Sequence, residues 1–93
     1  GYLLGDQGSG YDLVRRAAAA VLLAVDDLGP PTALTPALVA AFQAPAPQRL
    51  GAVLQRATSG DVAKHLPVVL ATAAAGDAVA NDVLADGVEA LAM

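Results

Sequence analysis

Apolar residues recur at helical spacing along several stretches of the chain, and short segments rich in Gly, Pro, Ser and Thr separate these stretches. The clearest stretch runs from about Ser9 or Gly10 to Leu28, where apolar positions three and four residues apart form one stripe. The stripe consists of Leu13, Ala17, Val21, Ala24 and Leu28. Because every residue from Ala17 to Val25 is apolar, we expect this part of the helix to be buried on all sides.

Capping residues indicate where this first helix begins and ends. Ser9 can accept a hydrogen bond from a free N–H of the first turn, and Asp12 complements the positive end of the helix dipole. Gly29 suits the C′ position, and the two prolines that follow it cannot continue a helix. The sequence therefore predicts a helix that is bounded at both ends by suitable residue types.

Similar signals predict the middle of the chain. Thr35 as N-cap and Pro36 at the first helical position predict a short helix over residues 36–42. A proline-rich connector then precedes a helix over residues 48–57, whose apolar residues fall on one face. A capping segment at residues 58–61 leads into the next helix.

The last third of the chain predicts three helical segments. One begins at Asp61 or Val62 and is broken or kinked by Pro67, and a second covers residues 68–75 and is closed by Gly76. Asp77 is expected to cap the last helix, from residue 78 to about 91. The whole chain thus predicts an all-α fold of five or six short helices in one domain, 1–93. We expect a Gly-rich loop or strand remnant over 1–10 and helices over 11–93.

Composition limits the functions open to this chain. Its formal net charge of −4 argues against nucleic acid as a partner, and it has no basic amphipathic stretch for an anionic membrane. It has no Cys and only one His, His65, so we expect no metal site. The longest purely apolar run, Ala17 to Val25, is too short to cross a bilayer. No signal peptide is visible, so we expect a cytoplasmic protein.

Most polar residues form no catalytic pattern. Asp26 and Asp27 would point about 100° apart on a helix, which indicates a solvated helix end and not a metal site. Asp12 and Arg16 are four residues apart and are expected to form an ion pair. Three residues lack the neighbours that a nucleophile or general base needs, namely Ser9, Ser59 and His65. We therefore expect no catalytic residue in this chain.

The Gly-rich opening, Gly5-Asp6-Gln7-Gly8-Ser9-Gly10, has more chemical potential. It matches neither the phosphate-binding P-loop nor the dinucleotide-binding glycine motif. It does hold one carboxylate between glycines, just ahead of a predicted helix. A carboxylate accepts hydrogen bonds and can take two neighbouring hydroxyls of a sugar. The alternative is that Asp6 only caps the start of the helix.

This opening, with Arg15-Arg16-Ala17 after it, resembles the Gly-Asp-Glu-Gly-Ser segment of N-acetylglucosamine kinases. Those enzymes belong to the BadF/BadG/BcrA/BcrD-type ATPase family, within the actin-like sugar kinase superfamily. The stretches at 66–70 and 74–80 are similar to a later part of the same family, in the same order. Gln7 departs from the family pattern by replacing Glu, and Val14-Arg15 stands where a small residue precedes the Arg.

The resemblance implies roles for individual residues. Asp6 corresponds to the carboxylate that hydrogen-bonds the amino sugar, and Gly1 to the last glycine of a sugar-contacting turn. Gly5, Gly8 and Ser9 correspond to residues that shape this loop. The remaining residues correspond to the helical subdomain beside the cleft between two actin-like lobes.

The resemblance also implies a larger enzyme that uses ATP and Mg²⁺ to phosphorylate an amino sugar. The family's phosphate-binding and adenosine-binding motifs do not occur in these 93 residues. We therefore expect an excised part of a kinase that binds no cofactor and is inactive alone. Phosphoryl transfer requires those groups to position the phosphates and the metal.

Two other interpretations remain open. Some members of the family are ATPases that drive electron transfer with cysteine-ligated iron–sulfur clusters, and the absence of Cys here favours the sugar kinase. The other is a free-standing all-α module that forms homo-oligomers through apolar helix faces. Its support is the apolar fraction of 56% together with only 15% charged residues.

Overall fold

The computed structural model describes the backbone of residues 7–92 and the side chains of residues 10–86. The regular elements of this part of the chain are all helices, which confirms the all-α prediction. They are α2 (Gln7–Val25), α3 (Leu34–Ala41), the 3₁₀-helix η1 (Pro47–Arg49), α4 (Leu50–Arg56), α5 (Ser59–Ala63), α6 (Leu66–Ala74) and α7 (Ala78–Ala92).

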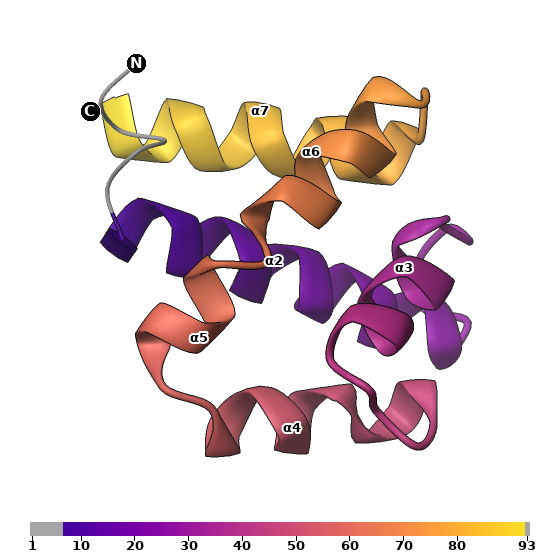
Figure 1. Ribbon diagram of the computed structural model, residues 1–93. Helices are drawn as coiled ribbons and strands as arrows, with labels where there is room; N and C mark the ends of the chain where they lie inside the picture. Colours follow the sequence, from indigo (N-terminus) through magenta and orange to yellow (C-terminus); the bar gives the residue numbers. More distant parts are fainter. Residues whose placement is uncertain (1–6, 93) are drawn as a thin grey trace.

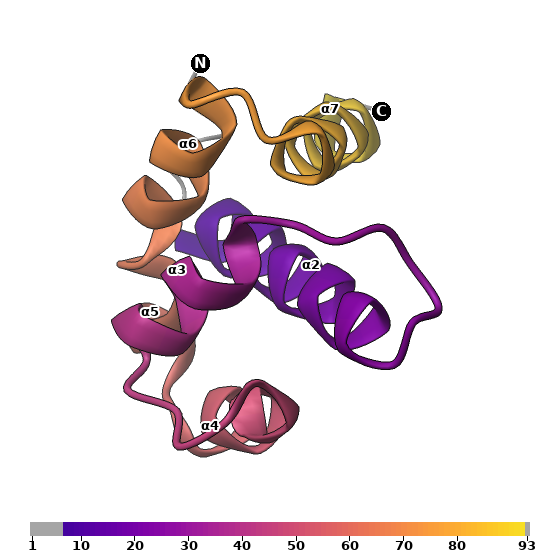
Figure 2. The same ribbon diagram turned by 90° about the vertical axis from the view of Figure 1, so that its right-hand side faces the viewer.

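Helix α2 is the central element, and every other helix contacts it. Helices α4 and α7 lie on opposite sides of α2, with α3, α5 and α6 gathered along one face of it (Figures 1 and 2). Helices α3, α5 and α6 thus cover one face of α2. The opposite face is bordered by α4 on one side and by α7 on the other.

The core follows from that arrangement. Helix α2 supplies Leu13, Val14, Ala17, Ala18 and Val21, all of them buried. The other helices add Leu34, Leu38, Leu50, Val62, Leu66, Val69, Ala73, Ala80 and Val83. A buried Leu or Val contributes about 1.5–3 kcal/mol, so the leucines and valines account for most of the hydrophobic stabilisation.

The prediction that residues 17–25 are buried on all sides is wrong. The side chain of Leu23 is 49% exposed, and Ala19 is also exposed. Both residues lie on the face of α2 that α3, α5 and α6 leave open. An apolar stretch of sequence cannot reveal this, because the neighbours of a helix decide which of its faces is covered.

The C-terminus of α2 also differs from the prediction. The helix ends at Val25, and Asp27 adopts a left-handed conformation with φ of 59°. The N–H of Asp27 donates to the carbonyl of Ala24 at 3.2 Å, and the N–H of Leu28 donates to that of Leu23 at 2.8 Å. These two bonds form a Schellman motif with Asp27, and not Gly29, at C′. Leu28 therefore leaves the predicted stripe and is 75% exposed.

The N-terminus of α2 lies earlier than predicted. Because the helix begins at Gln7, Gly8 and Ser9 are in its first turn and not in a loop that extends to residue 10. Gly10 is buried where α2 meets α5, and a Cβ added to it would lie 3.4 Å from the Cβ of Ala63. Gly10, which the sequence assigns to the predicted loop, therefore allows α2 and α5 to pack closely.

The start of α3 also differs from the prediction. Helix α3 begins at Leu34, because Thr32 and not Thr35 provides the capping hydroxyl, which accepts from the N–H of Leu34 at 3.1 Å. Residues 47–56 form η1 and α4, close to the helix predicted over residues 48–57.

The capping segment at residues 58–61 is confirmed, although α5 starts slightly earlier than expected. Helix α5 begins at Ser59, after Thr58 as its N-cap. Pro67 separates α5 from α6 by occupying the first turn of α6, so it breaks the helix and does not kink it.

Candidate functional site

The Gly-rich motif leads directly into α2. Gln7, the residue after Asp6 in the sequence, is the first residue of the helix. Gly8 and Ser9 follow in the first turn, whereas Gly1, Gly5 and Asp6 lie outside the described residues. The first N–H groups of a helix have no intrahelical partner and carry partial positive charge. A carboxylate that precedes such a helix is electrostatically favoured in its ionised form.

One turn further along α2, Asp12 joins two arginines. Its Oδ1 accepts from Arg15 Nη2 at 2.8 Å and its Oδ2 from Arg16 Nε at 2.7 Å. The hydrogen bond from Arg16, followed by that from Arg15, lowers the pKa of the Asp12 carboxyl below its usual value. The predicted pair between Asp12 and Arg16 is confirmed. Both arginines are engaged by this carboxylate, so the geometry favours a structural role for them over phosphate binding.

Asp77 is the most connected polar side chain among the described residues. Its Oδ2 accepts from the Thr32 hydroxyl at 2.6 Å and from the N–H of Ala80 at 2.9 Å, and its Oδ1 accepts from the N–H of Ala33 at 2.8 Å. Burial raises the pKa of Asp77, but these hydrogen bonds outweigh burial and lower it below its usual value. The predicted cap of α7 is confirmed, whereas the partners on the segment before α3 could not be read from sequence.

His65 packs against another ring. The centroids of the His65 and Phe42 rings are 4.2 Å apart and the ring planes are inclined by 55°. His65 is therefore a half-buried side chain that packs against Phe42. The sequence gives no sign that Phe42 is its neighbour, because the two residues come from different helical segments.

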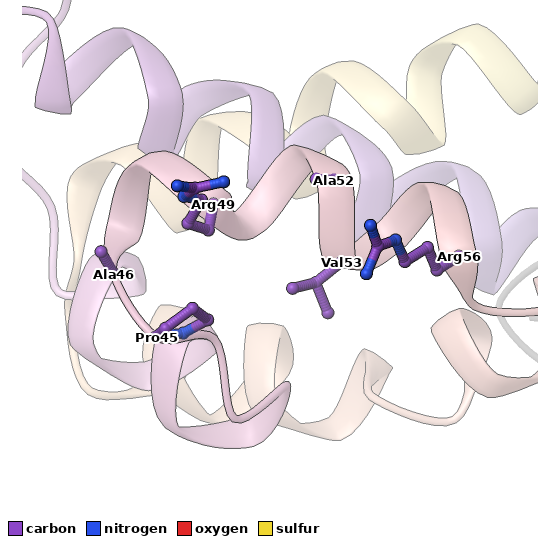
Figure 3. Close-up of a pocket in the computed structure, with 6 residues that line it drawn as sticks. All are labelled: Pro45, Ala46, Arg49, Ala52, Val53 and Arg56. Atoms are coloured by element: carbon purple, nitrogen blue, oxygen red, sulfur yellow. The ribbon is translucent and has the colours of Figure 1, made fainter.

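A depression on α4 is not signalled by any motif in the sequence. It has a volume of about 300 Å³ and is lined by Pro45, Ala46, Arg49, Ala52, Val53 and Arg56. Figure 3 shows Arg49 and Arg56 on either side of Val53, with Pro45 across the depression. The salt bridges between described residues involve only Arg15, Arg16 and Lys64 as cations. Arg49 and Arg56 thus have no acidic partner within this part of the chain. The side chains of both arginines are also exposed.

The open face of α2 carries two shallow grooves. The groove between α2 and α4 has a volume of about 300 Å³ and includes Tyr11, Leu22 and Leu54. The groove between α2 and α7 has a volume of about 340 Å³ and includes Leu23 and Asp86. Arg15 and Ala19 line both grooves, so the two form one apolar surface with a polar margin.

Among the described residues, no group of three or more His, Asp or Glu side chains could hold a metal ion. Within the same part of the chain, no helix has both the length and the apolar character needed to cross a membrane.

No protein-family model matches the sequence, and no characterised protein or solved structure shows significant similarity to it.

Proposed function

We propose that this chain is the helical part of an ATP-dependent sugar kinase that resembles N-acetylglucosamine kinase, and that it supplies part of the amino-sugar site. The observation that carries the proposal is the junction between the Gly-Asp-Gln-Gly-Ser motif and α2. The helix begins at Gln7, immediately after Asp6 in the sequence. In the sequence, Asp6 thus immediately precedes the first turn of a long helix, whose free N–H groups carry partial positive charge.

The chemistry of that junction suits a sugar. Each carboxylate oxygen can accept from a separate hydroxyl, so Asp6 would bind two neighbouring hydroxyls and orient the ring. The partial positive charge at the start of α2 favours the ionised carboxylate that such binding requires. Gly1 and Gly5 keep the roles that the resemblance implies for them, namely sugar contact for Gly1 and shaping of the loop for Gly5, whereas Gly8 and Ser9 belong to the first turn of α2.

The open face of α2 also supports the proposal. Leu23 is 49% exposed there and lines the groove between α2 and α7. An apolar surface of this kind is typical of a contact with another domain or chain. In the proposed kinase, a neighbouring lobe covers this face and supplies the sites for ATP and Mg²⁺. The enzyme acts in the cytoplasm, and this chain alone is inactive.

The proposal is tested in the complete kinase with Asp6→Ala. Loss of two hydrogen bonds to a charged acceptor raises the KM for N-acetylglucosamine by about 100- to 10,000-fold, with little change in the KM for ATP. The matched control is Asp12→Ala, which removes a carboxylate from α2 that is already bound by two arginines and leaves both constants unchanged. Equal effects of Asp6→Ala on the two substrates would show that Asp6 only holds the loop. A reading frame without phosphate-binding motifs around this segment would refute the kinase proposal itself.

A free-standing oligomerisation module is the second candidate, and the exposed apolar face of α2 favours it. Under this alternative, Leu23→Glu converts an oligomer of the isolated chain into a monomer in sedimentation experiments. Because Leu23 is half exposed, the same substitution leaves the thermal unfolding of the monomer nearly unchanged. If the isolated chain sediments as a monomer before the substitution, the module interpretation fails and the kinase proposal is unaffected.

A further inference from the structure

The depression on α4 has an arginine at each end and opens away from α2. Arg49, Val53 and Arg56 are spaced by four and three residues, which places them along one side of the continuous helix formed by η1 and α4. The opposite side of this helix faces α2, because a Cβ added to Gly51 would lie 3.4 Å from Cδ1 of Leu22. The depression therefore offers two cationic ends and an apolar centre to a partner outside the molecule.

The matching combination of groups lies directly after α2. Asp26 and Asp27 are exposed and form no salt bridge within the described part of the chain. The side chain of Leu28 beside them is 75% exposed, the largest fraction for a large apolar residue among those described. We call Asp26, Asp27 and Leu28 the acidic tip. The connection between α2 and α3, which begins with these residues, projects beyond the helices around it (Figure 2).

The backbone of the acidic tip is already ordered. The N–H groups of Asp27 and Leu28 donate to carbonyls of the last turns of α2 at 3.2 and 2.8 Å, in the Schellman motif described above. An ordered segment loses little conformational entropy when it binds. Leu28 is exposed to water in this conformation, so its burial against an apolar surface favours binding.

From these two surfaces we propose that the acidic tip of one molecule inserts into the depression on α4 of a second copy. Leu28 enters the apolar centre at Val53. The carboxylates of Asp26 and Asp27 then lie toward the arginines at the two ends. The depression, with a volume of about 300 Å³, is large enough for a leucine side chain. Two negative charges beside an apolar group thus meet two positive charges beside an apolar group.

A second copy is favoured over other occupants because this chain carries both matching surfaces. Within one molecule, neither aspartate of the acidic tip pairs with an arginine of the depression. The net charge of −4 disfavours nucleic acid and anionic lipid as ligands of the depression. A small anion would pair with the arginines but would leave the apolar centre exposed to water.

The form of the assembly follows from the positions of the two surfaces. Each copy carries one acidic tip and one depression, so the contact is head-to-tail and leads to a ring or an open chain. A single tip in a single depression buries less than the roughly 1,200–2,000 Å² typical of stable complexes. The dissociation constant is therefore expected to be about millimolar. Because the ion pairs are at the surface, association weakens as salt shortens the Debye length.

The test is sedimentation equilibrium of the 93-residue chain at low salt and about millimolar concentration. Leu28→Ser raises the dissociation constant for self-association by about tenfold, because the apolar contact is lost. Leu70→Ser is the matched control, at an exposed leucine of α6, and leaves association within about twofold. Circular dichroism verifies that each variant is folded.

The charged part of the contact is tested in the same way. Arg56→Glu raises the dissociation constant by about tenfold, because it sets a carboxylate against the acidic tip. Lys64→Glu makes the same charge change at the C-cap of α5, away from both surfaces, and leaves association within about twofold.

A mixture of two variants tests the head-to-tail geometry. The Leu28→Ser variant keeps an intact depression, and the Arg56→Glu variant keeps an intact acidic tip. An equimolar mixture therefore regains one unaltered contact for each pair of molecules. Because the altered surfaces cannot extend the assembly, the mixture forms a dimer of one copy of each variant and nothing larger.

Several outcomes would overturn the proposal. These are a chain that stays monomeric at millimolar concentration, a mixture that fails to associate, or association that Arg56→Glu weakens and Leu28→Ser does not. Leu23→Glu should leave this association unchanged, and its loss would place the contact on the open face of α2 instead. The outcome is independent of the sugar-kinase proposal, because neither surface includes residues of the Gly-rich motif.

Discussion

Asp77 accepts a hydrogen bond of 2.6 Å from the hydroxyl of Thr32, a residue 45 positions earlier in the chain. The same carboxylate caps α7 through the N–H of Ala80 and also accepts from the N–H of Ala33. A single side chain thus joins the last helix to the segment that leads into α3. This link joins α7 to the start of α3, and these two helices have few other contacts with each other.

Replacement of Asp77 is expected to destabilise the chain. Asp77→Ala removes the N-cap of α7 and the bonds to Thr32 and Ala33, which lowers the free energy of unfolding by about 2 kcal/mol. Urea denaturation measures the loss. Asp82→Ala, at an exposed aspartate of the same helix, serves as the control and changes the value by less than about 0.5 kcal/mol. A double-mutant cycle with Thr32→Val isolates the long-range bond, and additive effects would show that it contributes nothing.

Acid is expected to weaken the fold through the same carboxylates. The pKa values of Asp12 and Asp77 in the folded chain lie below the ordinary value of 3.8, so the unfolded chain binds protons more readily. Their contribution is fully present above that value and is lost as the pH falls through the folded pKa. Urea denaturation from pH 6 to about pH 2.5 should therefore show a decline below about pH 4. Asp77→Asn should make that decline shallower, and an unchanged slope would contradict the assignment.

Gln43 is a position where glycine should stabilise the chain. It has φ of 53°, and it follows α3 at the C′ position of a Schellman motif, in which the N–H of Ala44 donates to the carbonyl of Val39 at 3.0 Å. A side chain is strained in this conformation, so Gln43→Gly should raise the free energy of unfolding by about 0.5–1 kcal/mol. Gln55→Gly, at an exposed position inside α4, should lower it by about 1 kcal/mol. Thermal unfolding of the pair gives opposite signs if the left-handed backbone is the cause.

Gly10 tests how closely α2 and α5 pack. Its missing side chain leaves room for about one methyl group, because an added Cβ would lie 3.4 Å from the Cβ of Ala63. Gly10→Ala should be neutral or stabilise by up to about 1 kcal/mol, since alanine favours the helix. Gly10→Leu should destabilise by about 1–3 kcal/mol, because the larger side chain forces the helices apart. Equal stability of the two variants, measured by urea denaturation, would show that the contact is loose.

Local signals in the sequence were sufficient for the helices. Proline and glycine can end or start a helix through their own backbone restrictions, so the breaks near Pro31, Pro67 and Gly76 were predicted close to their observed places. The errors arose where two nearby residues compete for one role. Asp27 took the C′ position expected of Gly29, and Thr32 took the capping role expected of Thr35. In the second case, the hydrogen bonds that Thr32 and Ala33 donate to Asp77 favour the earlier start.

The depression on α4 and the exposed face of α2 could be recognised only from the tertiary structure. The spacing of Arg49 and Arg56 was visible in the sequence, but their lack of a partner among the described residues and the depression between them depend on where η1 and α4 lie. The exposed face of α2 was likewise hidden, since Leu23 and Val21 are equally apolar in the sequence and only one of them is covered.

Local patterns in the sequence predicted that this chain is helical, where each helix lies to within about three residues, and that Asp12 pairs with Arg16. These properties depend on backbone restrictions and on contacts within one or two turns of a helix. Only the tertiary structure decided which face of α2 is buried, which hydroxyl Asp77 binds and which arginines of the described chain remain unpaired. Those outcomes depend on residues far apart in sequence, which meet only after the chain has folded.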